Sequence, residues 1–178
     1  MRVNVCVRAI RATNETELGG SVPIRVIPAN GLTDDMVARW RTIQAANPDL
    51  ASPYFCPEYV QAVASVRDDV EIALIEQGNA IAAFFAFQRE RPAVIGAVGG
   101  GLADHVGIIG PQDLDIDPRE LLNACRAKVW DFDHLLASQP TFTPFHRERH
   151  VSPILDISNG YDAYVATCPS VKAEQRKL

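Results

Sequence analysis

The sequence has no excess of positive charge. Its 17 lysine and arginine residues are outnumbered by 22 aspartate and glutamate residues, which gives a formal net charge of -5, and the two signs are interspersed along the chain. A nucleic-acid-binding protein presents a basic patch or stripe to the phosphates. We therefore expect no nucleic-acid partner.

Long apolar runs are also lacking. No stretch approaches the roughly 20 apolar residues that a membrane-spanning helix needs. A secretory signal needs an apolar run of about 7 to 15 residues after a charged start, but Arg8, Arg11 and Glu15 interrupt the N-terminal segment. The sequence predicts a protein without a membrane span, located in the cytoplasm.

Closely spaced metal ligands and dithiols are absent as well. No two of the four cysteines have the two-residue spacing of zinc sites and redox dithiols; they are Cys6, Cys56, Cys125 and Cys168. We expect reduced thiols that pack in the core. His134, His146 and His150 are expected on different elements, so no metal site is predicted.

What is present indicates one globular domain. The chain has 178 residues, of which 47% are hydrophobic, enough for one core and too few for two independent ones. A first strand is predicted at residues 24–29. Thr33 is the expected N-cap of a helix that stops near Asn47, because the residue before a proline is disfavoured in the α region.

A second helix is expected to start at Pro57, with Tyr59, Val63 and Val66 facing inward. Next comes a hairpin, with strands from Val70 and from Ala80 to Gln88 joined by the turn Gly78-Asn79. The further expectations are a turn at 89–92, strands at 93–98 and 106–109, a helix from Asp117 through Cys125, strands at 132–136 and 151–157, and a short helix at Tyr161.

Together these elements predict an α+β (or α/β) fold, in which helices flank a central and mostly antiparallel sheet. Residues 1–22 form an N-terminal extension, which is either a short extra strand, indicated by alternating valines, or a ragged leader. Residues 23–168 form the main lobe. Residues 169–178 are basic and have few apolar anchors, as expected of a connector to a further segment.

Gly99-Gly100-Gly101 follows a strand, as phosphate-binding loops do. However, no P-loop lysine is present and no helix start follows directly. A tight turn or bulge at a sheet edge is therefore favoured over nucleotide binding.

Asp104 and His105 follow these glycines, where loops after strands often present side chains to a cleft. We predict them as substrate-binding residues. Adjacent residues in an extended segment point to opposite sides, so they are not expected to form an acid–base dyad, and a turn-forming role for Asp104 is the alternative. Large aromatics are assigned to the core; they are Trp40, Phe84, Phe85, Phe87 and Trp130.

Four stretches occur in a familiar order. They are Trp40 in the first helix, residues 52–59 (SPYFCPEY), residues 99–107 with Asp104, and residues 152–156 (SPILD) followed by 160–162 (GYD). In order and spacing, roughly residues 24–178 resemble the N-terminal half of the CelD-like and FemAB-like branch of the GNAT acyltransferases. The family pattern has an aromatic residue after the aspartate where this chain has His105, so Asp104 is the only residue to which the resemblance assigns a ligand contact.

The resemblance implies a first lobe that packs against a second lobe and shapes the cleft for a small-molecule acceptor. The second lobe carries the acetyl-CoA or acyl-CoA site, so no cofactor is expected to bind this chain alone. Acyl transfer would belong to the two-lobe protein, in polysaccharide or cell-envelope biosynthesis, and the expected partner is a second lobe or another copy of the chain. The alternatives are a non-catalytic interaction or assembly module, and a self-contained acetyltransferase whose donor loop is Gly99 to Gly101.

Overall fold

The computed structural model describes residues 2–5, 10–11, 22–146, 148–152 and 157–167. The chain divides into two compact units, and the larger one spans Val3–His150. Among the described residues, the smaller unit holds Arg2, residues 151–152 and residues 157–167. The predicted lobe boundary at residue 168 and the predicted connector at 169–178 lie outside the described residues.

The larger unit is built on a six-stranded sheet in the order β2-β7-β6-β5-β4-β3. Neighbouring strands are antiparallel except β6 and β7, which are parallel. The strands are β2 (Ile10–Arg11), β3 (Ile24–Pro28), β4 (Val70–Gln77), β5 (Ala80–Arg91), β6 (Val94–Gly96) and β7 (Val129–Asp131). The predicted α+β class, with a mostly antiparallel sheet flanked by helices, is confirmed.

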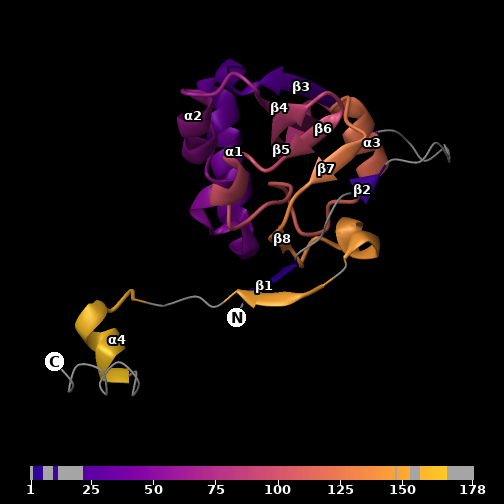
Figure 1. Ribbon diagram of the computed structural model, residues 1–178. Helices are drawn as coiled ribbons and strands as arrows, with labels where there is room; N and C mark the ends of the chain where they lie inside the picture. Colours follow the sequence, from indigo (N-terminus) through magenta and orange to yellow (C-terminus); the bar gives the residue numbers. More distant parts are fainter. Residues whose placement is uncertain (1, 6–9, 12–21, 147, 153–156, 168–178) are drawn as a thin grey trace. The chain divides into compact units, whose positions relative to one another are not determined.

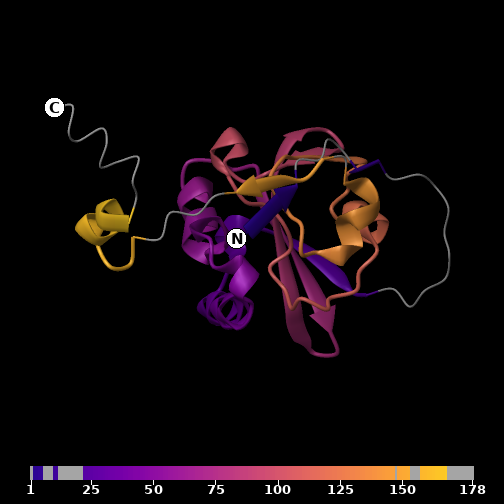
Figure 2. The same cartoon turned by 90° about the horizontal axis from the view of Figure 1, so that it is seen from below.

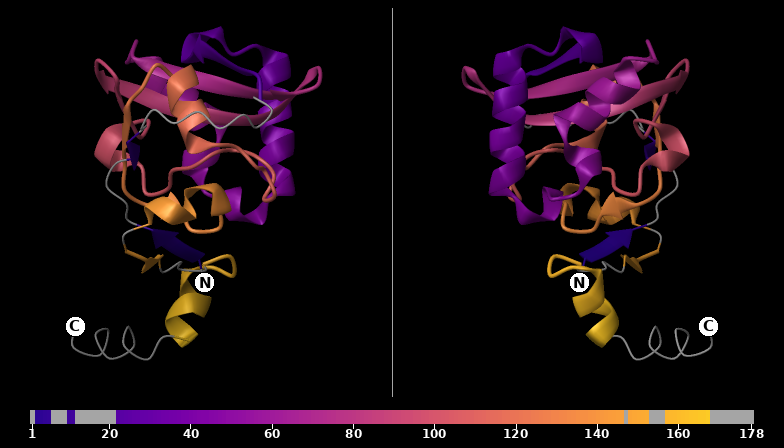
Figure 3. Two further views of the ribbon diagram at one scale, coloured as in Figure 1. Left: turned by 90° about the vertical axis from the view of Figure 1, so that its right-hand side faces the viewer. Right: turned by 90° about the vertical axis from the view of Figure 1, so that its left-hand side faces the viewer.

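Helices cover both faces of this sheet, as Figures 1 and 2 show. On one face, α1 (Asp34–Ala46) and α2 (Pro57–Ala64) pack against alternate residues of β4 and β5, including Ile72 and Phe84. On the other face, α3 (Pro118–Ala124) packs against the intervening residues, including Ala73 and Phe85. The two views in Figure 3 look onto these opposite faces. The central strands are therefore buried on both sides.

The start and end of α1 agree with the sequence prediction. Thr33 Oγ1 accepts a hydrogen bond from Met36 N at 3.3 Å, and Asp34 and Asp35 place negative charge at the positive end of the helix dipole. The helix ends at Ala46, one residue before Asn47, which adopts an extended conformation ahead of Pro48. Both ends of this helix could be predicted from the sequence because capping depends on residues only a few positions apart.

The predicted inward face of α2 is partly wrong. Val66 is 80% exposed, whereas Val60, which was not assigned inward, is 1% exposed. The helix ends at Ala64, so helical periodicity no longer determines the direction of Val66. Tyr59 and Val63 are half-buried beside the core.

Several strand predictions also need correction. Strand β5 continues through Arg91, so the turn lies at residues 92–93 and not at 89–92. Residues 106–109 form two isolated bridges, from Val106 to Leu135 and from Ile109 to Phe84, because each end pairs with a different partner.

The predicted strand at 132–136 is broken by His134, whose φ of 58° is incompatible with an extended chain. What forms instead is β7 before it and β8 (Leu135–Leu136) after it. Strand β9 (His150–Ser152) covers the start of the predicted 151–157 strand, whose residues 153–156 lie outside the described part. Helix α4 (Tyr161–Thr167) begins where the short helix was expected.

Of the two alternatives for the N-terminal segment, its described residues adopt the strand form. Strand β1 (Arg2–Val5) pairs with β8, and β2 pairs with β7. Both pairings are antiparallel.

Helix α3 ends in a Schellman motif that has an arginine where glycine is usual. Ala127 N donates to Leu122 O at 2.9 Å and Arg126 N donates to Asn123 O at 3.0 Å. Arg126 has a φ of 51°, in the left-handed region that glycine occupies without strain.

We therefore expect Arg126→Gly to raise the free energy of unfolding by about 1 kcal/mol, through relief of this backbone strain. Arg126→Ala removes the same side chain but keeps the strain, so it should leave stability unchanged. Urea denaturation of the three proteins measures both effects. A stabilisation of equal size in both variants would assign the effect to the side chain and contradict the explanation.

Candidate functional site

The predicted residues Asp104 and His105 lie in the segment that follows η4, a short 3-10 helix at Gly100–Leu102. Asp104 is exposed and His105 is half-buried. His105 Nδ1 lies 3.1 Å from Ser52 Oγ, at hydrogen-bond distance. The structure thus joins His105 to a serine that is 53 residues earlier in the chain, a contact with no signal in the sequence.

Ser52 begins a turn that carries two aromatic rings to His105. The turn is η3 (Pro53–Phe55), and the ring centroids of Tyr54 and Phe55 each lie 6.3 Å from that of His105. Trp40 Nε1 donates to Phe55 O at 2.7 Å, which ties the turn to α1. This hydrogen bond joins the motif at 52–59 to the buried tryptophan of α1. It requires the indole N–H as the donor.

Tyr59, on the first turn of α2, forms the third aromatic wall. Its ring meets that of Tyr54 edge to face, with centroids 5.1 Å apart and planes at 87°. Its hydroxyl donates to Val98 O at 3.0 Å. Burial raises the pKa of Tyr59 above its usual value, with smaller contributions from Tyr54 and the negative charge of Asp104. The carboxylate of Asp104 therefore acts electrostatically on this phenol.

These side chains surround a small cavity at the carboxyl ends of β6 and β7, whose parallel pairing ends at Gly96 and Asp131. The cavity has a volume of about 20 Å³, which is room for about one water molecule. Crevices at the carboxyl ends of parallel strands are common ligand sites. The lining is Tyr54, Phe55, Tyr59, Val60, Ala86, Ala97, Val98, Ala103, His105, Val106, Gly107, Ile109 and Trp130. It contains no lysine, arginine or carboxylate.

Amide side chains hold the loop that encloses this cavity. Gln88 Oε1 accepts from Gly99 N at 3.1 Å, and Asn47 Nδ2 donates to Gly110 O at 3.0 Å. Gln139 binds both backbone groups of Ile108, accepting from its N–H at 3.0 Å and donating to its carbonyl at 2.7 Å. The sequence analysis missed these three residues, because glutamine and asparagine give no pattern that identifies a distant backbone partner.

The Ser52–His105 contact does not form a complete nucleophilic site. Ser52 is buried, at 5% exposure, so its hydroxyl is poorly placed to attack a substrate that arrives from solvent. A serine nucleophile needs access to its substrate as well as a neighbouring base. The contact positions the η3 turn against the loop. The predicted residue Asp104 is exposed and is not among the residues that line the cavity.

The helix N-termini are negatively charged throughout the described part of the chain. The first turns contain Asp34 and Asp35 in α1, Glu58 in α2, Glu120 in α3 and Asp162 in α4. In addition, the Asp117 carboxylate accepts from Arg119 N at 2.8 Å and so occupies the start of α3. Phosphate groups favour helix N-termini because of free N–H groups and positive dipole charge. The acidic residues oppose the effect of the dipole, and the side chains of Thr33 and Asp117 occupy an N–H group at the starts of α1 and α3.

The described cysteines do not form a reactive or metal-binding group. Burial raises the pKa of Cys125 to about 12, as expected for a core thiol. Cys56 is half-buried, and its Sγ accepts from Gln44 Nε2 at 3.4 Å. Cys6 and Cys168 lie outside the described residues. Within the described ranges, no three histidine, cysteine or acidic side chains come together to hold a metal ion.

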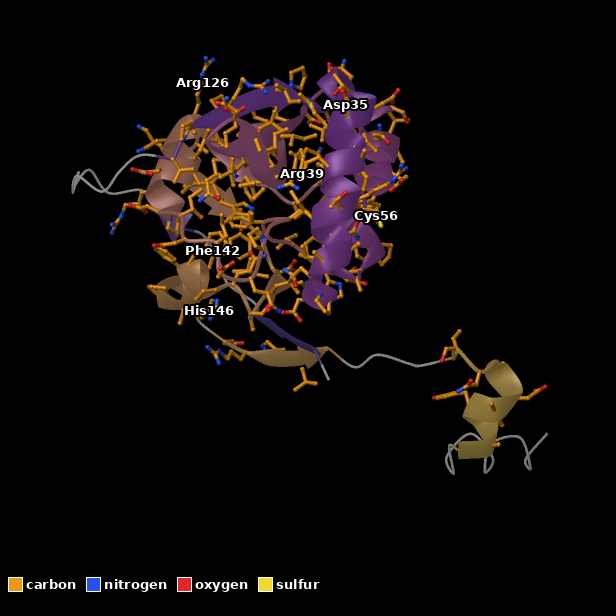
Figure 4. The ribbon with its side chains drawn as sticks, turned by 180° about the vertical axis from the view of Figure 1, so that it is seen from behind. Asp35, Arg39, Cys56, Arg126, Phe142 and His146 are labelled. Atoms are coloured by element: carbon orange, nitrogen blue, oxygen red, sulfur yellow. The ribbon has the colours of Figure 1, made fainter. Side chains whose placement is uncertain are left out.

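The large aromatics assigned to the core are buried as predicted, with Trp40 at 0% and Trp130 at 2% exposure. Two of the three histidines that were expected on different elements have separate acidic neighbours: His134 contacts Asp133 and His150 contacts Glu148, each at 3.0 Å. His146 lies beyond η5 (Pro140–Phe145), close to Phe142 in Figure 4 and far from Cys56.

His146 should make stability depend on pH. Both of its ring nitrogens are buried without a hydrogen-bond partner among the described residues. Burial, and secondarily the positive charge of Arg149, lowers the pKa of His146 below its usual value. As the pH falls, the unfolded chain therefore takes up this proton before the folded chain does, and stability decreases from the unfolded-state pKa of about 6.5 towards the folded-state pKa.

We expect the wild type to lose more stability than His146→Phe when the pH is lowered from about 7 to about 5. Urea denaturation at several pH values measures the difference. Parallel pH profiles for the two proteins would show that His146 titrates equally in both states and would contradict the expectation.

No helix in the described part of the chain is long and apolar enough to cross a membrane. Comparison of the chain with known protein families, curated proteins and solved structures finds no match in any of the three.

Proposed function

We propose that this chain is a non-catalytic GNAT-like lobe, which contributes to acyl transfer only together with a second lobe that binds the acyl-CoA donor. The order of elements supports the proposal by analogy of fold. Strand β3 is followed by two helices, three antiparallel strands, a helix and a strand parallel to the last of the three. A mostly antiparallel sheet flanked by helices is the architecture that the resemblance to that family implies.

The observation that carries the non-catalytic part is the charge at the helix starts. A CoA pyrophosphate needs backbone N–H groups at an uncapped, positively polarised helix N-terminus. In the described residues, each α-helix has an acidic first turn, and Gly99 to Gly101 leads into a 3-10 helix of 3 residues and then an extended segment. The negative charge of these first turns opposes a bound pyrophosphate, and α1 and α3 are also capped by the side chains of Thr33 and Asp117.

The cavity supports the same proposal. At about 20 Å³ it holds a water molecule but not an acyl-pantetheine arm. The loop that encloses it is held by Gln88, Asn47 and Gln139, so enlarging it requires breaking several hydrogen bonds. In this proposal, the acceptor cleft and the donor site form where a second lobe, or a second copy, meets this one.

The test is titration of the purified chain with acetyl-CoA and a long-chain acyl-CoA, followed by calorimetry and thermal shift. We expect no saturable binding of either donor. Saturable binding at one site per chain would overturn the non-catalytic assignment. If a donor does bind, Gly100→Ala tests the alternative of a self-contained acetyltransferase whose donor loop is Gly99 to Gly101. An added Cβ at Gly100 meets no atom within 4 Å. A loss of donor binding in this variant would therefore place the donor at the glycine turn.

A partner should also be detectable. Sedimentation of the chain alone distinguishes a monomer from a homo-oligomer, and acyltransferase activity is expected only after a second lobe is supplied. Activity of the isolated chain with any amine or hydroxyl acceptor would contradict the proposal.

A further inference from the structure

A second and larger cleft, the Arg39 cleft, lies between α1, the end of the β4–β5 hairpin and the loop at residues 111–113. Its volume is about 510 Å³, within the range of roughly 300 to 1,000 Å³ that is typical of small-molecule sites. It shares no lining residue with the small cavity described above. The Arg39 cleft therefore has room for a small organic molecule at a separate place in the fold.

Hydrogen bonds hold the loop wall of this cleft against the end of α1. Asn47 Nδ2 donates to Gly110 O at 3.0 Å, and Gln112 Nε2 donates to Asp49 Oδ2 at 3.2 Å. Asn47 and Gln112 also line the cleft. The walls are thus connected before any ligand arrives, as is usual for small-molecule sites.

Arg39 supplies the positive charge of the lining. Its side chain reaches from α1 to β5, where Nε donates to Ile81 O at 2.8 Å (Figure 4). Asp35 lies four residues earlier on α1, a spacing at which opposite charges often pair, but Arg39 forms no ion pair with any residue that the structure describes. The bond to Ile81 orients the guanidinium and leaves its two terminal nitrogens to bind a carboxylate in the paired geometry that arginine favours.

Asp113 supplies a negative charge to the same lining. No ion pair joins it to Arg39, although the structure describes both side chains. A ligand with only a carboxylate would meet the like charge of Asp113, and a ligand with only an ammonium would meet the like charge of Arg39. A zwitterion can place each of its charges beside the opposite one.

The lining also includes apolar surface. Ile43 is 7% exposed, Ala82 is half-buried, and Pro111 contributes from the loop. Apolar surface with a few polar groups that fix orientation is the usual composition of a small-molecule site. This composition suits a ligand whose two charged groups are carried on a short aliphatic body.

We propose that the Arg39 cleft binds a small aliphatic amino acid, with its carboxylate on Arg39 and its ammonium group towards Asp113. This inference is independent of the proposed acyltransferase role, because it requires neither an acyl donor nor a second lobe. The acyl-CoA titration is a separate measurement, so the two proposals can fail independently.

The test is a titration of the isotope-labelled full chain, followed by amide chemical shifts at constant pH and ionic strength. The probes are leucine and 6-aminohexanoate, which carry the same two charges at short and long separation. N-acetylleucine lacks the ammonium group and leucinamide lacks the carboxylate. We expect weak saturable shifts at residues 39–47, 77–82 and 110–113 with at least one of the two amino acids, and clearly weaker binding of both single-charge analogues.

Two pairs of variants assign the charges. Arg39→Gln should weaken binding about tenfold, as expected for loss of a charge-assisted hydrogen-bonded pair, whereas Arg119→Gln removes an exposed arginine of α3 and should bind like the wild type. Asp113→Asn should weaken binding about fivefold, near the upper range for an exposed charge pair. Asp115→Asn is its control, because Asp115 is also exposed but does not line the cleft.

All four substitutions are at exposed positions, and unchanged amide shifts outside the cleft verify that each variant is folded. The proposal is overturned if neither amino acid gives saturable shifts at the cleft, if either single-charge analogue binds as tightly as the amino acids, or if a variant of Arg39 or Asp113 binds as tightly as its control.

Discussion

Replacing Gly99 by alanine is expected to lower the free energy of unfolding by about 3 kcal/mol. Gly99 has a φ of 79°, and an alanine in this left-handed region costs about 1 to 2 kcal/mol. An added Cβ would also collide with the Tyr59 hydroxyl oxygen and lie 3.3 Å from Cζ of the same ring. The tyrosine must move, and its hydrogen bond to Val98 O, worth about 1 kcal/mol, is lost.

Gly100→Ala is the matched control for this substitution. Gly100 also has a positive φ, of 58°, but nothing lies within 4 Å of an added Cβ. It should therefore lose only the backbone contribution of about 1 to 2 kcal/mol. Urea denaturation with tryptophan fluorescence compares the two variants, and equal losses would mean that contact with Tyr59 does not restrict residue 99.

Trp40→Ala should cost about 4 kcal/mol, within the range for removal of a buried tryptophan. Trp40 is fully buried and stacks on Phe84, with ring centroids 4.7 Å apart. Its indole N–H is also the donor to Phe55 O. One side chain thus links α1, the central strand β5 and the η3 turn of the candidate site.

Trp40→Phe separates these contributions. It keeps an aromatic ring but removes the donor, leaving the buried Phe55 carbonyl unsatisfied at a cost of about 1 to 3 kcal/mol. We expect it also to perturb the amide resonances of residues 52–56. Val66→Ala is the control, since Val66 is 80% exposed, and it should change stability by less than about 0.5 kcal/mol. A large decrease in the free energy of unfolding of Val66→Ala would instead support the sequence prediction that Val66 faces inward.

The sequence predictions were most accurate where the determining interactions are local. The Thr33 cap, the stop before Pro48, the Gly78-Asn79 hairpin and the Asp117 cap all depend on residues within a few positions of one another, and all four are confirmed. They failed where a distant partner decides the outcome. The ends of residues 106–109 pair with Leu135 and Phe84, so no regular strand forms.

The candidate site shows the same division. Asp104 and His105 were selected because loops after strands often present side chains to ligands, and their role as substrate-binding residues stays a prediction. Tyr54 and Tyr59 were present in the motif at 52–59 but were not assigned to the site. The sequence motif gives the positions of these tyrosines along the chain. Whether they line a site depends on which segments of the chain pack against each other in the fold.

The sequence by itself determined that the protein combines helices with a mostly antiparallel sheet, where the main helices start, and that the helix starts carry acidic residues. Each of these properties follows from neighbouring residues through capping, backbone preference or charge. Only the tertiary structure decided that Ser52 meets His105, that Gln139 holds Ile108, and that Gly99 is packed against Tyr59. All three contacts join residues 31 to 53 positions apart. They form because the sheet and its two helical layers bring the segments together, and no local preference encodes that arrangement.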